Sequence, residues 1–105
     1  MISRAGIKVA VAARVLAFLK TLSPESRHRI RLAIADLKYE KGDIEALEGD
    51  MAGYHRLRIR SYRVIFRYDV SEGGKRKIFC PLVEHRSVVY VILENLLQDH
   101  SSGDV

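Results

Sequence analysis

The feature that most constrains this chain is a run in which arginine alternates with apolar residues, Tyr54-His55-Arg56-Leu57-Arg58-Ile59-Arg60. A period of two is typical of a β-strand, because successive side chains of a strand point to opposite faces of the sheet. The run predicts a strand over residues 54–60, with its three arginines on one face and Leu57 and Ile59 facing the core. No acidic residue lies between positions 54 and 67, so we expect this arginine cluster to be unbalanced by acidic neighbours.

Two helices and one strand are predicted before this run. Alternation predicts a short strand at about 6–11, and helical spacing of apolar residues predicts a helix from Ala12 to about residue 22. Ser23 is a good N-cap and Pro24 suits the first position of a second helix, which runs to about Lys38. Turn signals through residues 39–53 predict an irregular connection, which Ile44, Leu47 and Met51 attach to the core.

After the arginine run, a meander of strands is predicted. Tyr62 to Val70 and Lys77 to Val83 are rich in β-formers, and Glu72-Gly73-Gly74 between them predicts a hairpin turn. Pro81 cannot donate a ladder hydrogen bond, so it predicts a bulge, an edge strand or an early end. Residues 88–97 predict a last short helix, or a strand leading into one, and about 98–105 a polar, flexible tail.

The expected fold class is therefore α+β, in a single domain over residues 1–105. Two N-terminal helices pack on one face of a small, twisted, mainly antiparallel sheet, and a short C-terminal helix follows. The chain has one cysteine and no apolar run of membrane-spanning length. Together these features favour the cytoplasm.

The charge is concentrated in the middle of the chain. The whole chain has a net charge of +5, but residues 54–90 hold nine basic and three acidic residues, a local net charge of +6. Such an excess favours a polyanionic partner. Arginine binds phosphate through its bidentate fork, and tyrosine rings can stack on bases, as in proteins that bind single-stranded RNA. The alternative is that solvent-facing strand positions are polar and arginine is a common choice there.

Other chemistry has weaker support in the sequence. The histidines, Cys80 and the carboxylates show no metal-ligand spacing, and no glycine-rich phosphate loop is present, so no metal or cofactor is predicted. His55 is expected to face the core, because Arg56 faces outward. His85 follows the last predicted strand and could transfer protons at neutral pH, or it could be structural.

Three segments carry a family resemblance. They are Phe18 to Pro24 before a basic helix, Leu47-Glu48-Gly49 before the run from Tyr54 to Phe66, and His85-Arg86-Ser87-Val88-Val89-Tyr90. In this order they resemble the RelE/ParE superfamily of bacterial and archaeal toxins of type II toxin–antitoxin systems. The resemblance covers about residues 7–97. It implies the same α+β fold and, for the favoured RelE-like branch, a ribosome-dependent endoribonuclease that cuts mRNA and thereby inhibits translation.

The resemblance also implies roles for individual residues. The 2′-hydroxyl of the RNA would attack the adjacent phosphate, arginines would stabilise the developing charge, and His85 or Tyr90 would handle protons. Arginine stands at 56 and 58 where some relatives have lysine, and arginine is a poor general base. The predicted catalytic residues are Arg58, Arg63, Arg86, Tyr90 and His85, and the predicted RNA-binding residues are Arg56, Arg60, Arg67, Tyr54 and Tyr62.

Two other functions stay open at this stage. A ParE-like protein shares the fold but inhibits DNA gyrase through protein–protein contact without catalysis, and an inactive remnant would only bind RNA or its antitoxin. Either toxin implies a cognate antitoxin, which we expect to be small and to carry an acidic or amphipathic segment. A RelE-like toxin would also bind the ribosome and mRNA, and a ParE-like toxin would bind DNA gyrase. No membrane partner is expected.

Overall fold

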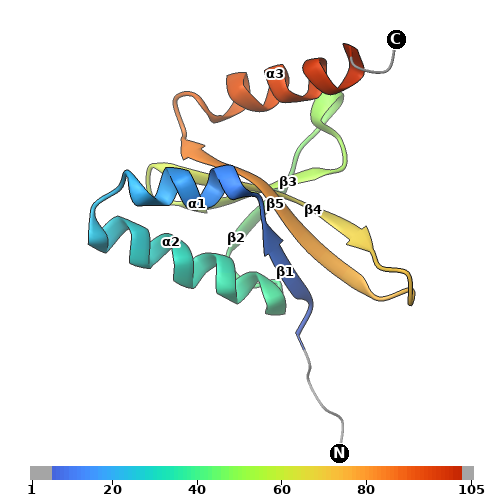
Figure 1. Ribbon diagram of the computed structural model, residues 1–105, viewed down its shortest axis with the longest axis horizontal. Helices are drawn as coiled ribbons and strands as arrows, with labels where there is room; N and C mark the ends of the chain where they lie inside the picture. Colours follow the sequence, from blue (N-terminus) through green and yellow to red (C-terminus); the bar gives the residue numbers. More distant parts are fainter. Residues whose placement is uncertain (1–5, 103–105) are drawn as a thin grey trace, which may run out of the picture.

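The computed structural model describes residues 6–102 as one five-stranded sheet flanked by helices (Figure 1). The strand order is β1-β5-β4-β3-β2. The sheet is antiparallel except where β1 pairs with β5 in parallel. This arrangement confirms the predicted α+β class. In chain order the elements are β1 (Lys8–Val11), α1 (Ala13–Lys20), α2 (Pro24–Asp36), a 3₁₀ turn (Leu37–Tyr39), β2 (Asp43–Ala46), a second 3₁₀ turn (Gly49–Met51), β3 (Tyr54–Ile59), β4 (Tyr62–Val70), β5 (Arg76–His85) and α3 (Val89–Ser102).

Helices α1 and α2 cover one face of the sheet and enclose the larger core. Ser23 caps α2 as predicted, because its Oγ accepts a 3.3 Å hydrogen bond from the Ser26 backbone N–H, and Pro24 begins the helix. His55 lies on this face, as predicted, with its ring stacked on Phe66 at 5.2 Å between centroids. The buried core residues are Val15, Leu19, Ile30, Ile34, Leu37, Leu57, Ile59, Val64, Phe66, Ile78, Cys80 and Val83.

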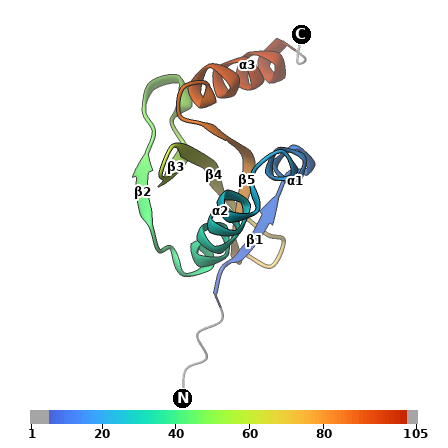
Figure 2. The ribbon, with the colours of Figure 1, turned by 90° about the vertical axis from the view of Figure 1, so that its left-hand side faces the viewer.

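Helix α3 lies on the opposite face of the sheet, as Figures 1 and 2 show. Its Val89 and Leu93 pack with Ile65 of β4 and Leu82 of β5 in a second, smaller core. The predicted C-terminal helix is present, but it is longer than expected: α3 has 14 residues and reaches Ser102, so residues 98–102 are helical rather than part of a polar tail. Residues 103–105 lie outside the described part. No helix within residues 6–102 is long and apolar enough to cross a membrane.

The connection predicted over residues 39–53 contains a strand, β2, that the sequence analysis missed. Its four residues alternate, with Ile44 packed on the larger core and Asp43 and Glu45 exposed. β2 pairs with β3 so that Asp43 lies opposite Arg58 and Glu45 opposite Arg56. The strand is too short and too acidic for its own pattern to predict it, and it forms because β3 offers an edge.

The bulge that Pro81 allowed is present in β5. Ile65 pairs with Leu82 and Arg67 with Phe79, so two residues of β5 lie against Phe66 alone. β5 lies between β1 and β4 and is therefore not an edge strand. The missing N–H of Pro81 falls where the ladder is already interrupted, which explains how a proline fits the middle of the sheet.

Candidate nucleic-acid interface

The centre of the candidate site is a pair of arginines that face each other across β3 and β4. The register places Arg58 directly opposite Arg63, next to the two-residue turn that joins the strands. Both lie on the face that α3 covers farther along the sheet, since Arg63 is two residues from Ile65. Like charges directly opposite each other destabilise a sheet. This Arg58–Arg63 rung is therefore a place where an anion would be stabilising.

Strand β2 neutralises the neighbouring part of the arginine face. Arg56 donates to Asp43 at 3.3 Å and to Glu45 at 2.7 Å, and its side chain is only 14% exposed. Arg58 donates through Nε to Asp43 at 2.7 Å. Burial opposes the ionisation of Asp43, but the bonds from Arg56 and Arg58 together lower the pKa of that carboxyl. The expectation of an unbalanced arginine cluster is thus wrong, because the balancing acids come from a strand earlier in the chain.

The Arg58–Arg63 rung nevertheless keeps hydrogen-bonding capacity. Arg58 is half-exposed and uses only Nε in its ion pair, so its two terminal nitrogens make no hydrogen bond to described residues. Arg63 donates through Nη1 to the Arg60 and Tyr62 carbonyls, both at 2.9 Å, and pairs with no acid within residues 6–102. Those two bonds hold Arg63 in place through backbone carbonyls rather than through an ion pair. The rung can therefore bind a phosphate bidentately.

Glu84 is a carboxylate that sequence reasoning did not single out. It is the β5 partner of Arg63 and lies on the same face. Burial raises the pKa of Glu84, against the lowering effects of the His85 backbone N–H and the charge of Arg14. Its two-residue spacing from Leu82 was the signal that could have placed it. Within residues 6–102, no three His, Cys, Asp or Glu side chains gather as a metal-binding group.

Two further predicted residues follow β5 on the way into α3. The Arg86 backbone N–H donates to the Ser61 carbonyl at 2.7 Å, which fixes Arg86 beside the β3–β4 turn, and its side chain is exposed. Tyr90 is the second residue of α3 and packs against the smaller core. Arg58, Arg63, Arg86 and Tyr90 thus come from four separate segments around one end of the sheet.

His85 does not join this group. It pairs with Tyr62, whose ring lies 5.9 Å away on the face covered by α1 and α2. His85 Nδ1 is 2.8 Å from Ser87 Oγ and also accepts a 3.1 Å bond from the Ser87 backbone N–H. The sheet therefore separates His85 from Arg63, and the two predicted catalytic residues lie on opposite faces.

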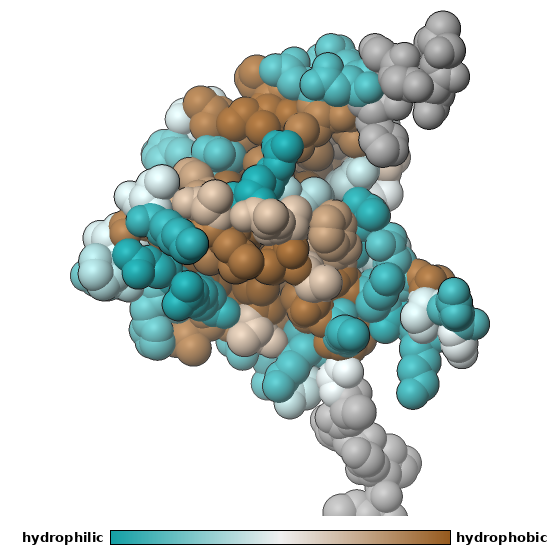
Figure 3. Space-filling model, viewed as in Figure 1, coloured by the Kyte–Doolittle hydropathy of each residue, from teal (hydrophilic) through white to brown (hydrophobic). Residues whose placement is uncertain are grey.

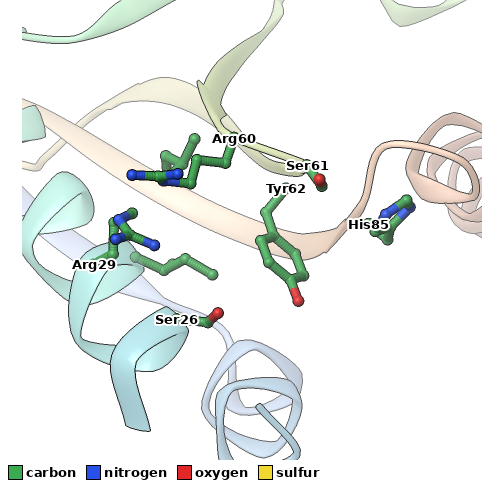
Figure 4. A pocket seen from close by; sticks show the side chains of 8 residues that line it. Ser26, Arg29, Arg60, Ser61, Tyr62 and His85 are labelled. Carbon is green, nitrogen blue, oxygen red and sulfur yellow. The ribbon is translucent and has the colours of Figure 1, made fainter. Parts of the chain in front are cut away.

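Arg60 also departs from the prediction. β3 ends at Ile59, and Arg60 begins the turn with a left-handed φ of 54°. The turn ends the two-residue alternation, so Arg60 does not share the face of Arg56 and Arg58. It lines a hollow of about 290 Å³ on the helix side, shown in Figure 4. The lining residues are Ser26, Arg29, Ile30, Ile59, Arg60, Ser61, Tyr62 and His85.

The two remaining predicted RNA-binding residues, Tyr54 and Arg67, lie opposite each other at the far end of the arginine face. Arg67 pairs with Asp69 at 3.0 Å, and its guanidinium lies 4.7 Å from the centre of the Phe79 ring. Both residues line a second hollow, of about 340 Å³, against the second half of α3. Figure 3 shows apolar residues gathered beneath α3, with hydrophilic side chains around them. The predicted site residues are thus divided among the arginine face near the β3–β4 turn, the hollow on the helix side and the second hollow beneath α3.

Comparison with known proteins identifies the fold. No protein-family model matches the sequence, and no curated protein sequence does. Among solved structures, the chain is similar to the RelBE2 toxin–antitoxin complex of Mycobacterium tuberculosis at 20% identity and a TM-score of 0.64. That match covers 77% of this chain and 99% of the matched chain.

Two other solved structures agree with this match. The archaeal RelE–RelB complex of Pyrococcus horikoshii OT3 is 28% identical, with a TM-score of 0.58, over 77% of this chain and 96% of that chain. The YoeB/ParE toxin of Agrobacterium tumefaciens is 22% identical, with a TM-score of 0.61, over 75% and 98%. The fold is therefore that of RelE/ParE-superfamily toxins, which confirms the resemblance found in the sequence.

Proposed function

We propose that the protein is the toxin of a type II toxin–antitoxin system and acts as a metal-independent endoribonuclease on mRNA. The fold supports the toxin role, since the similar structures are toxins or toxin–antitoxin complexes and nearly their whole chains are matched. The Arg58–Arg63 rung is the observation that carries the nuclease activity. It places two arginines directly opposite each other on neighbouring strands, and Arg63 makes no ion pair with a described residue.

The proposed mechanism uses the RNA's own nucleophile. The 2′-oxygen attacks the adjacent phosphorus, the bond to the 5′-oxygen breaks, and a cyclic phosphate is left. Arg58, Arg63 and Arg86 stabilise the negative charge that develops on the phosphate oxygens, usually the largest catalytic contribution. The geometry favours this role most for Arg63, because two carbonyl bonds fix its guanidinium and it therefore needs little reorganisation during the reaction.

Proton transfer falls to groups on the same face as the rung. Glu84 is the β5 partner of Arg63 and accepts the proton of the attacking 2′-hydroxyl. Its raised pKa brings it nearer to neutral pH, as general acid–base catalysis requires. Tyr90 is the second group, and it can donate to the leaving 5′-oxygen. His85 is less suited than the sequence suggested, because it lies behind the sheet and is bonded to Ser87.

A cognate antitoxin is the partner that this function requires. Two of the similar structures are toxin–antitoxin complexes, and the exposed arginines favour an acidic antitoxin segment. Such a contact weakens as salt screens it. The ribosome and its bound mRNA are the proposed target.

Inhibition of DNA gyrase by protein contact is the second candidate. The ion pairs of Arg56 and Arg58 with β2 favour it, because they show that part of the arginine face is structural. Gyrase inhibition requires neither an Arg63 without an ion pair to a described residue nor the raised pKa of Glu84. The nuclease proposal therefore accounts for more of the observed features.

Primer extension on cellular mRNA after induction of the protein distinguishes these functions. The nuclease predicts rapid loss of translation with new 5′ ends in mRNA, both absent from an Arg63→Ala, Arg86→Ala double variant. A DNA-damage response with intact mRNA would instead assign the gyrase function. Unchanged growth with folded, soluble protein would indicate an inactive remnant.

A further inference from the structure

The hollow between α2 and the β3–β4 turn has an amphipathic lining. Its floor contains the buried side chains of Ile30 and Ile59, and its rim contains the guanidinium groups of Arg29 and Arg60. In Figure 4 the two guanidinium groups lie on one side of the hollow, with the Ser26 hydroxyl and the Tyr62 ring across from them. Small-molecule sites typically combine an apolar floor with a few polar groups in this way.

The charge in this hollow is only partly balanced. Arg29 pairs with Glu25 at 3.0 Å, one turn earlier in α2, and that pair is solvent-exposed. The Arg60 side chain makes no hydrogen bond or ion pair within residues 6–102 in the structure. Since Glu25 is outside the lining, the hollow itself contains two arginines and no acid. An anion placed between them would be bound by two guanidinium forks.

An aromatic ring forms one wall of the hollow. Tyr62 is half-buried and fixed on two sides, by Phe18 at 6.2 Å and by His85 at 5.9 Å between ring centroids. A ring held in this way can stack on a planar group without losing much side-chain freedom, and base–aromatic stacking is a common feature of single-strand binding. The Ser26 and Ser61 side chains supply hydroxyl groups at the rim.

We propose that this hollow binds one nucleotide of a single-stranded RNA, outside the catalytic rung. Its phosphate lies between Arg29 and Arg60, and its base lies against Tyr62 and the apolar floor. The identity of the polymer rests on the proposed function, whereas the hollow's affinity for a nucleotide does not. The strand then passes around the Arg60-Ser61 turn, because Arg58 is only two residues away on the opposite face.

The direct test measures the affinity of the full chain for a short single-stranded RNA whose 2′-hydroxyls are methylated, so that binding occurs without cleavage. An Arg29→Gln, Arg60→Gln double variant is expected to bind at least about tenfold more weakly, since hydrogen bonds to charged groups are among the stronger ones. The slope of log affinity against log salt should fall by about 0.7 for the lost phosphate contact.

The matched control is an Arg31→Gln, Lys75→Gln double variant, which removes the same charge from an exposed position of α2 and from the β4–β5 turn. Equal weakening in both double variants overturns the proposal, because it reduces the effect to net charge. Circular dichroism of both variants checks that each remains folded.

Small ligands separate a nucleotide from a bare anion. Adenosine monophosphate should shift the NMR signals of the Tyr62 ring and the Arg29 and Arg60 side chains at lower concentration than inorganic phosphate does. Equal effects of the two ligands would overturn the nucleotide assignment. If the wild-type protein binds RNA through this hollow but never cleaves it, only the nuclease proposal is wrong. If it cleaves RNA but fails the binding test, only this inference is wrong.

Discussion

The two faces of the sheet are built in different ways. The face under α1 and α2 is largely apolar, although His55 and His85 also lie on it, and its core includes residues from both helices and from all five strands. The face under α3 is apolar only in the middle, where Ile65 and Leu82 meet the helix. Arginines occupy its margins. The first face supplies most of the stability and has the proposed nucleotide-binding hollow at one end, whereas the second combines a small core with the arginines of the proposed catalytic site.

This difference shows why charged groups can gather on the second face. Arginine side chains need solvent or an acidic partner, and a face covered by only one helix supplies both. Arg56 forms ion pairs with the acidic residues of β2, whereas Arg63 forms no ion pair with a described residue. The predictions test the difference between the large apolar core on the first face and the charged groups on the second.

The largest expected effect on stability is on the helix face. Phe66→Ala should lower the free energy of unfolding by about 3–5 kcal/mol, because the fully buried ring leaves a cavity. Val70→Ala in the same strand should change it by less than about 0.5 kcal/mol, since that side chain is 69% exposed. Urea denaturation measures both variants. Similar values for the two would contradict the assignment of the main core to this face.

A smaller effect is expected where β2 meets the arginine face. The folded-state pKa of Asp43 is lowered, so its ion pairs stabilise the protein above its ordinary value of 3.8 and are lost as the pH falls through the folded pKa. Asp43→Asn should therefore lower the melting temperature at pH 7 and leave it nearly unchanged at the acid end. Melting curves recorded between pH 7 and the acid end test this pH dependence. A difference in melting temperature between variant and wild type that grew towards low pH would contradict it.

The smallest expected effect is the reaction of a thiol reagent with Cys80, which lies in the core under α1 and α2. Burial raises the pKa of its thiol to about 12, so almost no thiolate exists at neutral pH. Iodoacetamide should leave the folded protein unmodified and label it fully in denaturant. Mass spectrometry measures both, with rapid labelling of the native protein as the contrary result.

The sequence predicted much of the fold because its patterns are local. The alternation in 54–60 and 62–70 is visible in the residues themselves, and Ser23-Pro24 fixes the start of α2. Pro81 restricted β5 to three alternatives, one of which the structure shows. β2 could not be predicted in this way, since a four-residue strand depends on the edge that β3 offers.

The site was less predictable because it depends on pairing between distant segments. Asp43 and Glu45 are more than ten residues from the arginines that they bind. Arg60 follows the alternation in the sequence, yet the turn removes it from the face. His85 and Glu84 are adjacent in the chain, but the strand points them to opposite faces.

The most direct test of the central claim is the rate of RNA cleavage on programmed ribosomes by the Arg63→Ala variant, with Lys75→Ala as the charge-matched control. We predict a loss of about 10²–10³ in rate for Arg63→Ala, the typical cost of removing one donor that stabilises the transition state. The Lys75→Ala variant should cleave at the wild-type rate, and circular dichroism should show that both variants are folded. Cleavage by folded Arg63→Ala at the wild-type rate would contradict the account.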